Sequence, residues 1–379
     1  MAIIDDSAIW PIVRAIAKGT QPTGKQRLLL QKWLLESSRA SVWQLSAANV
    51  DAVLTSRIQL LQRLGAHLDS HAIALPVAGN WIDWIPSLWT LWLPLAQSID
   101  AKQRQGNIPF VQGILGAQGT GKTTLTGILQ LILNCLGQRA VSLSIDDLYL
   151  TYHQRCQLKQ QDPRLVWRGP PGTHDVALGV STLSAFKRDG SKRDRSDGSL
   201  VAPEITLPRF DKSLQGGQGD RISPMLAQQP TVLLFEGWFI GAQPLPDELL
   251  AREDFAFPTP ILTEEDRQFA RDCNRRLRAY LPLWERLDNL IVLQPQDYRF
   301  SLRWRQQAEQ NMISGGKDGL SPDEVADFVV YFWKALHPEL FVTPLTVSTS
   351  THRHKAPSHK ASLVVSIDCN HMIARLYLP

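Results

Sequence analysis

The sequence contains few cysteines, and their spacing suits neither a disulfide framework nor a zinc site. The 379 residues include four of them, Cys135, Cys156, Cys273 and Cys369, without any C-x-x-C spacing. Disulfide-rich folds and structural zinc sites both depend on closely spaced cysteines. The sequence therefore predicts a protein of a reducing compartment, which we expect to be the cytoplasm.

Long hydrophobic runs and a basic leader are also missing. The most apolar window, residues 81–99, is interrupted by Asp83, Pro86 and Pro94 and is short for a membrane span. Near the N-terminus, Asp5 and Asp6 stand where a secretory signal would carry basic residues. We expect neither secretion nor a membrane partner.

Charge of one sign is not in large excess. The 40 lysines and arginines against 36 acidic residues give a net charge of +4. Over a chain of this length, that excess is too small to indicate a nucleic-acid partner, whereas a small anionic substrate is compatible with it. With 44% hydrophobic residues, the chain can bury a substantial core. We expect a soluble protein, a monomer, without a nucleic-acid partner.

Residues 1–100 have the periodicity of helices. Apolar residues recur at three- and four-residue steps from Val50 to Leu68, and residues 28–35 behave similarly. Trp81, Trp84, Trp89 and Trp92 also follow helical spacing, which favours a buried stripe over a surface that stacks bases. Because no catalytic motif lies here, we predict a helical N-terminal region.

From residue 109 onward, short apolar runs alternate with helical segments. The predicted strands are residues 110–115, 140–145, 232–235, 290–293 and 363–367, and the first is followed by a predicted helix at 122–136. Strands separated by helices indicate a doubly wound α/β sheet, mainly parallel, with right-handed crossovers. In such sheets ligands bind at the carboxyl ends of the strands. We assign residues 101–379 to this domain.

Two polar stretches are predicted to be irregular. Residues 187–199 (KRDGSKRDRSDGS) are dense in charge and indicate a solvated loop. Residues 348–362 are interpreted as a linker before the last strand. The alternative for this second stretch is a metal site formed by His352, His354 and His359.

The residues that join the first predicted strand to its helix read GAQGTGKT and fit G-x-x-x-x-G-K-[ST]. In this motif the backbone N–H groups and the helix N-terminus bind phosphates, the lysine reaches the β- and γ-phosphates, and the hydroxyl binds Mg²⁺. A similar string at residues 19–25 is rejected, because Gln26 replaces the hydroxyl and Pro22 removes a backbone donor. The predicted ATP-binding residues are Gly116, Ala117, Gln118, Gly119, Thr120, Gly121, Lys122, Thr123 and Thr124.

Carboxylates end two further predicted strands. Asp146 and Asp147 follow the second strand, which a right-handed crossover brings close to the phosphate loop. A carboxylate there can accept the proton of a substrate hydroxyl or order the Mg²⁺ shell, whereas an aspartate can also cap a helix. We predict Asp146 as the base and an Mg²⁺-associated acid, and Asp147 as a cap or a supporting acid. Glu236 ends the third strand, as in a Walker B element, and is predicted to act on Mg²⁺ with Thr123.

Three other segments carry charged side chains in unusual settings. RGPPGTHD (168–175) and PRFDKS followed by GDR (208–221) mix turn residues with hydrogen-bonding groups, which suits a small polar ligand, although such loops are often only connections. Residues 298–320 are predicted to form a lid. Within it, Arg303 and Arg305 would neutralise the transferring phosphoryl group, or else belong to a solvated basic face.

The order of P-loop, D-D-L-Y (146–149) and F-E-G-W (235–238) resembles the uridine kinase, phosphoribulokinase and pantothenate kinase superfamily of P-loop kinases. In that group the acid of D-x-[FL]-Y is the base and the acid of F-E-G serves Mg²⁺, which matches Asp146 and Glu236. A finer resemblance, to plant-type D-glycerate 3-kinase, covers roughly residues 80–379. It rests on the segments 168–175, 208–221, 233–241, 303–309 and 316–338. The stretch near Lys187 and residues 1–80 depart from it.

The resemblance implies ATP-dependent phosphorylation of the 3-hydroxyl of D-glycerate, giving 3-phosphoglycerate and ADP. The residues alone indicate only an ATP-dependent kinase of a small hydroxylated acceptor. Another acceptor (a nucleoside, pantothenate or a sugar phosphate) and a non-catalytic nucleotide-binding switch stay open as alternatives. For glycerate, the predicted substrate-binding side chains are Arg168, His174, Asp175, Arg209, Lys212 and Arg221.

Overall fold

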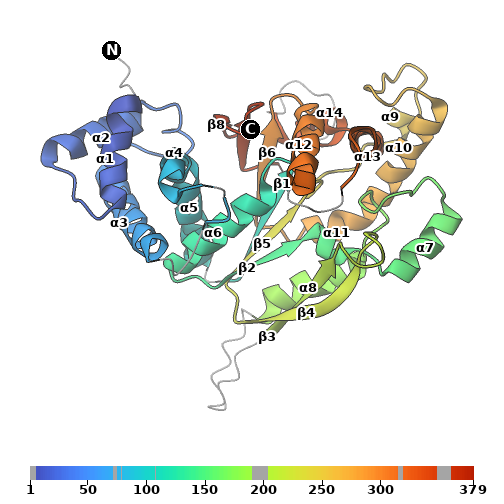
Figure 1. The fold of residues 1–379 in the computed structure, drawn as a ribbon, viewed down its shortest axis with the longest axis horizontal. Coiled ribbons are helices and arrows are strands. Elements are labelled where there is room, and N and C mark those ends of the chain that lie inside the picture. The colour runs from blue at the N-terminus through green and yellow to red at the C-terminus, as the bar shows by residue number, and fades with distance from the viewer. Residues whose placement is uncertain are drawn as a thin grey trace.

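The computed structural model describes residues 6–70, 75–77, 79–106, 108–189, 204–314, 319–347 and 360–379. Helices of the first hundred residues lie at one end of the molecule, a twisted sheet occupies the centre, and α7, α9 and α10 lie at the opposite end (Figure 1). Those three helices are Tyr152–Gln161, Asp247–Leu250 and Glu264–Leu277. None of the described helices combines the length and the apolar character needed to cross a bilayer.

The N-terminal helices share one hydrophobic core with the helix that follows the phosphate loop. They are α1 (Asp6–Ala17), α2 (Gly24–Glu36), α3 (Val50–Asp69), η1 (Trp81–Trp84), α4 (Ile85–Ser87), the π-helical turn η2 (Leu88–Trp92) and α5 (Leu93–Gly106). Leu54 of α3 and Ile99 of α5 belong to the same buried cluster as Ile128 of α6 (Lys122–Cys135). Of the tryptophan stripe, Trp89 and Trp92 are buried, whereas Trp81 and Trp84 are half-buried.

The central sheet has the strand order β2-β5-β1-β6-β7-β8. Its members are β1 (Phe110–Gly116), β2 (Ala140–Ser144), β5 (Val232–Gly237), β6 (Asn289–Pro295), β7 (Leu363–Ile367) and β8 (Ile373–Tyr377). All pairs are parallel except β7 with β8. The five predicted strands and the doubly wound α/β class are therefore confirmed, and β8 is an antiparallel addition at the edge that the sequence analysis missed.

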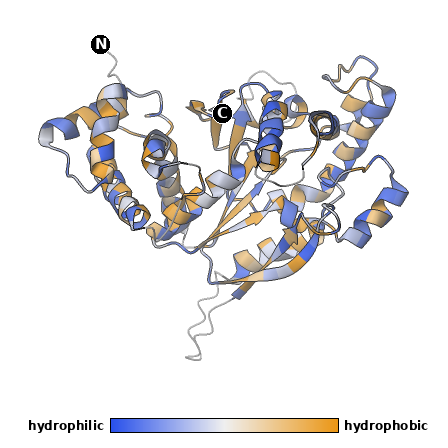
Figure 2. Ribbon diagram, in the orientation of Figure 1, coloured by the Kyte–Doolittle hydropathy of each residue, from blue (hydrophilic) through white to orange (hydrophobic). Residues whose placement is uncertain are grey.

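Helices cover both faces of the sheet, so its inner strands are buried on both sides, as expected for parallel strands. In β1, Phe110 and Ile114 face the core shared with α6, whereas Val111 and Leu115 face the opposite core. That second core includes α8 (Val176–Asp189), α10, η4 (Arg278–Tyr280), α11 (Leu281–Trp284) and α13 (Pro322–Ala335). The strands are correspondingly hydrophobic along their length (Figure 2).

The remaining elements surround the carboxyl edge of the sheet. They are η3 (Ile145–Leu148), the antiparallel hairpin β3 (Glu204–Asp211) and β4 (Asp220–Gln228), α12 (Phe300–Ser314), α14 (Pro338–Phe341) and α15 (Thr343–Thr346). The hairpin corrects the sequence interpretation, because residues 208–211 and 220–221 lie in paired strands and only the residues between them form a turn.

The two stretches predicted to be irregular are only partly described. In the first, Lys187 and the two residues after it complete α8 and are therefore helical. Residues 190–199, and the histidines at 352, 354 and 359, lie outside the described residues. Across the part of the chain that is described, no three His, Cys, Asp or Glu side chains are grouped to hold a metal ion.

A buried arginine provides a test of the N-terminal core. Arg57 of α3 is 2% exposed, its guanidinium lies 5.6 Å from the ring centre of Trp89, and burial lowers its pKa to about 10. Its Nε has no hydrogen-bond partner. A buried charge without a carboxylate is costly, so Arg57→Met should stabilise the fold by about 1 kcal/mol in urea unfolding. Arg57→Ala, which leaves a cavity, should destabilise it by about 2–3 kcal/mol. A methionine variant less stable than the alanine variant would contradict this account.

Candidate active site

The phosphate loop is a tight turn whose shape requires glycine. Gly119 and Gly121 have φ values of +77° and +82°, the left-handed region that favours glycine. A Cβ atom at Gly116 would lie 2.5 Å from the hydroxyl of Thr120. Lys122 opens α6 and donates from Nζ to the carbonyl of Ala117 at 3.0 Å. Loop, lysine and helix N-terminus therefore form an anion-binding cradle.

Glu236 lies beside this cradle because β5 pairs directly with β1. It is 7% exposed, and it accepts a hydrogen bond from the Thr123 hydroxyl at 3.2 Å. Burial raises the pKa of Glu236, and the nearby Lys122 opposes that rise. The predicted pair, Thr123 and Glu236, is thus brought together. Two hard oxygens suit Mg²⁺, which usually takes one or two carboxylates and completes its shell with phosphates and water.

Asp146 and Asp147 are neighbours in η3, but their carboxylates have different partners. Asp147 accepts from the backbone N–H of Ser144 at 3.0 Å and of Phe210 at 3.3 Å, and its carboxylate pairs with Arg209 at 3.3 Å. Asp147 therefore completes the capping box of η3, whose N-cap is Ser144, and ties β3 to the end of β2. Among the described residues, the partners of the Asp146 carboxylate are side chains and not backbone N–H groups.

The Asp146 carboxylate accepts from Lys212 Nζ at 2.6 Å and from the hydroxyl of Tyr149. Burial by itself would raise its pKa, but the Lys212 ammonium and the hydrogen bonds from Lys212 and Tyr149 hold the pKa below its ordinary value. Asp146 is therefore ionised near neutral pH, as a general base must be.

The 168–175 segment is joined to the D-D-L-Y segment by backbone hydrogen bonds. Asp175 donates to Leu148 at 2.7 Å and Leu150 donates to Thr173 at 3.1 Å. His174 is buried, stacks on Tyr149 at 4.6 Å between ring centres, and places Nδ1 2.7 Å from the Tyr280 hydroxyl. Burial lowers the pKa of His174 to about 3, so the imidazole is neutral.

Three of the four predicted cations are engaged by the fold. Besides Asp147, Arg209 binds the carbonyl of Ser142 at 3.0 Å. Arg221 binds Asp175 and the carbonyl of Tyr149, each at 2.9 Å. Arg168 donates to two carbonyls of the hairpin turn, Gly217 and Gln218. Lys212 differs, because its partner is the candidate base itself.

The lid arginines are not brought to the phosphate loop. Arg303 is exposed on α12, and Arg305 pairs with Glu309 at 2.7 Å on the same helix. The intervening Trp304 makes the contact instead: a Cβ atom at Gly119 would lie 2.6 Å from Trp304 Cβ. The indole stacks on His371 and donates to the carbonyl of Cys369 at 3.1 Å. Trp304 was not among the predicted site residues, although it lies between the two arginines in the sequence.

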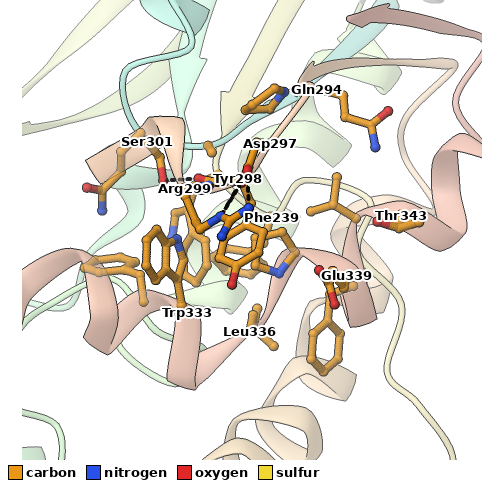
Figure 3. Close-up of a pocket in the computed structure, with 18 of the residues that line it drawn as sticks. Phe239, Gln294, Asp297, Tyr298, Arg299, Ser301, Trp333, Leu336, Glu339 and Thr343 are labelled. Atoms are coloured by element: carbon orange, nitrogen blue, oxygen red, sulfur yellow. Dashed lines mark hydrogen bonds and ion pairs between the residues drawn. The ribbon is translucent and has the colours of Figure 1, made fainter. Parts of the chain in front are cut away.

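A cavity of about 380 Å³ opens beside the first residues of the phosphate loop. Figure 3 shows Phe239, Tyr298, Trp333 and Leu336 around it, with the Asp297–Arg299 pair alongside. Its lining also includes Ala117 and Gln118 but none of the six predicted substrate-binding residues. This aromatic cavity was not predicted, because residues from β6, α12, α13 and the segment after β5 meet there only in the folded chain.

The chain is similar in sequence to known kinases. No protein-family model matches the chain. D-glycerate 3-kinase, chloroplastic, from Arabidopsis thaliana is 33% identical over 247 residues, which are 62% of this chain and 49% of that protein. The chain thus spans about half the length of that relative. The uncharacterized kinase mug58 of Schizosaccharomyces pombe is 33% identical over 232 residues, 59% of this chain and 78% of that protein.

A solved structure supports the same grouping. The D-glycerate 3-kinase from Cryptococcus neoformans has a TM-score of 0.63 and 28% identity, over 76% of this chain and 97% of that one. The fold described above is therefore similar to that of the Cryptococcus enzyme. These relatives confirm the grouping that the motifs predicted: this protein belongs to the plant-type D-glycerate 3-kinase family of P-loop kinases.

Proposed function

We propose that the protein transfers the γ-phosphoryl group of ATP to the 3-hydroxyl of D-glycerate, giving 3-phosphoglycerate and ADP. The observation that carries the proposal is the position of Asp146. Its carboxylate lies at the carboxyl edge of the sheet, contacts the side chains of Lys212 and Tyr149, and interacts electrostatically with Lys122 of the phosphate loop. The choice of glycerate is supported by the names of the Arabidopsis and Cryptococcus relatives.

In the proposed reaction the loop N–H groups and Lys122 hold the phosphates of ATP. Asp146 takes the proton from the acceptor hydroxyl while the acceptor oxygen bonds to the γ-phosphorus and the bond to the ADP oxygen breaks. Thr123 and Glu236 would hold Mg²⁺, which neutralises phosphate charge when bound. The cationic side chains near Asp146 would bind the carboxylate of glycerate.

A second candidate is a kinase of a larger hydroxylated acceptor, such as pantothenate or a nucleoside. The aromatic cavity of about 380 Å³ favours it, because glycerate is small and highly polar while this cavity could stack a ring or bury an apolar chain. Asp146 would play the same part in either reaction, so the two candidates differ only in the acceptor.

An acceptor panel distinguishes these candidates. ADP release with D-glycerate, glycerol, uridine, pantothenate and ribulose 5-phosphate should be fastest by far with D-glycerate. Glycerol keeps the hydroxyls but lacks the carboxylate, so its kcat/KM should be about 10- to 150-fold lower or worse, the effect of one lost charge-assisted hydrogen bond. Equal use of glycerol and glycerate, or a preference for pantothenate or uridine, would refute the glycerate assignment.

The phosphate loop is tested by Lys122→Ala. Turnover should fall to background, because the charge that follows the transferring phosphoryl group is lost, while circular dichroism should show an intact fold. The matched control is Lys25→Ala, which removes the exposed lysine of the rejected motif at residues 19–25 and should leave kcat unchanged. A Lys122→Ala enzyme that keeps more than about a tenth of wild-type activity would exclude this loop as the phosphate site.

The neighbouring aspartates should respond differently to amide substitution. Asp146→Asn should lower kcat by about 10²–10⁴ with little change in the KM for ATP, as expected for a general base. Asp147→Asn should have the smaller kinetic effect but lower the urea midpoint, since it weakens the links from η3 to Ser144 and Arg209. If Asp147→Asn is the more damaging change to kcat, the two roles are reversed.

A further inference from the structure

The cation nearest to the proposed chemistry is Lys212, the first residue after β3. Its side chain is 60% exposed, and Nζ lies 2.6 Å from Oδ2 of Asp146, whose side chain is 27% exposed. The lysine therefore reaches from the hairpin turn to the carboxylate along the surface. The ammonium of Lys212 is the solvent-exposed end of this pair, so water can stabilise it when it leaves the more buried carboxylate.

The other cations near the site are less free to move. The guanidinium of Arg209 is held by a carboxylate and two carbonyls, and that of Arg221 by Asp175 and the carbonyl of Tyr149. Moving either arginine would leave partly buried acceptors unpaired, which is costly. Lys212 has a flexible stem, and its departure from Asp146 would expose a carboxylate that the reaction needs. Among the described cations of these loops, it is therefore the one best able to change partner.

A lysine bound to the base creates a conflict that the acceptor can resolve. While Lys212 occupies Oδ2, the acceptor hydroxyl must compete with the ammonium for Asp146. An anionic acceptor brings its own carboxylate toward the γ-phosphate, where like charges repel unless a cation lies near. In glycerate a single carbon separates the carboxylate carbon from the carbon that bears the 3-hydroxyl. A glycerate hydroxyl placed on Asp146 thus brings the carboxylate close to Lys212.

We propose that Lys212 is a specificity switch: it pairs with Asp146 in the free enzyme and transfers to the carboxylate of the acceptor, which releases the base for the acceptor hydroxyl. The inference rests on the proposed function, because it needs an acceptor with both groups. An alcohol without a carboxylate cannot draw Lys212 away from Asp146, so its hydroxyl must compete with the ammonium for the base. Lys212 would then contribute to selectivity through the base as well as through direct binding.

The experiment compares kcat/KM for D-glycerate and for glycerol in wild type, Lys212→Met, Lys212→Arg and a control. Lys212→Met should lower the value for glycerate by about 10- to 150-fold, because one charge-assisted hydrogen bond is lost. The value for glycerol should stay the same or rise, because Asp146 is no longer paired. Lys212→Arg should retain most of the selectivity. Lys159→Met, which removes an exposed lysine of α7, should leave both values unchanged.

The outcomes separate this inference from the proposed function. A wild-type enzyme that does not favour glycerate over glycerol overturns the proposed function and the switch together. A selective wild-type enzyme whose Lys212→Met variant keeps its selectivity overturns the switch alone. An equal loss for both acceptors, with a raised KM for ATP, also overturns it and assigns Lys212 to the phosphoryl group instead. Collapse of the glycerate-to-glycerol ratio at an unchanged KM for ATP supports the switch.

Discussion

Two carboxylates and two lysines meet at the carboxyl ends of β1, β2 and β5, and the balance of their charges is the constraint on which the site depends. Burial lowers the pKa of Lys122 and raises that of Glu236, and each charge opposes the shift of the other. Asp146 is kept ionised mainly because Lys212 offsets its burial. The strand order places β5 between β1 and β2, which brings Lys122, Glu236 and Asp146 together, and Lys212 reaches them from the hairpin turn.

Much of the surrounding charge is used to hold the site together. The hairpin is fastened to the D-D-L-Y segment by Asp147 with Arg209, and to the 168–175 segment by Arg221 with Asp175. These two partly buried ion pairs hold the backbone segments that carry Asp146 and His174. Breaking either ion pair would leave a charge unpaired. An anionic acceptor would therefore meet few mobile cations here, which gives Lys212 its importance.

The N-terminal helices pack against α6 and so support the phosphate loop. Their apolar residues continue the core beneath α6, the helix whose N-terminus forms part of the phosphate cradle. On the outer side, α12 contacts the loop through Trp304, not through its arginines. Because Arg303 and Arg305 are directed elsewhere in this structure, a part for them in phosphoryl transfer would require α12 to move, as lids do in other kinases.

The sequence by itself determined the strands, the phosphate loop, the acids at the strand ends and the kinase family. These features are local, because glycines shape a turn, apolar runs form buried strands, and long motifs can be recognised from the order of residues alone. Tertiary structure decided what the remaining charges do. From sequence, Arg209 and Lys212 are equivalent cations three residues apart, yet one is bound to a structural carboxylate and the other to the candidate base. The aromatic cavity likewise exists only where segments far apart in the chain meet. Partner choice depends on distances across the fold, which no local pattern encodes.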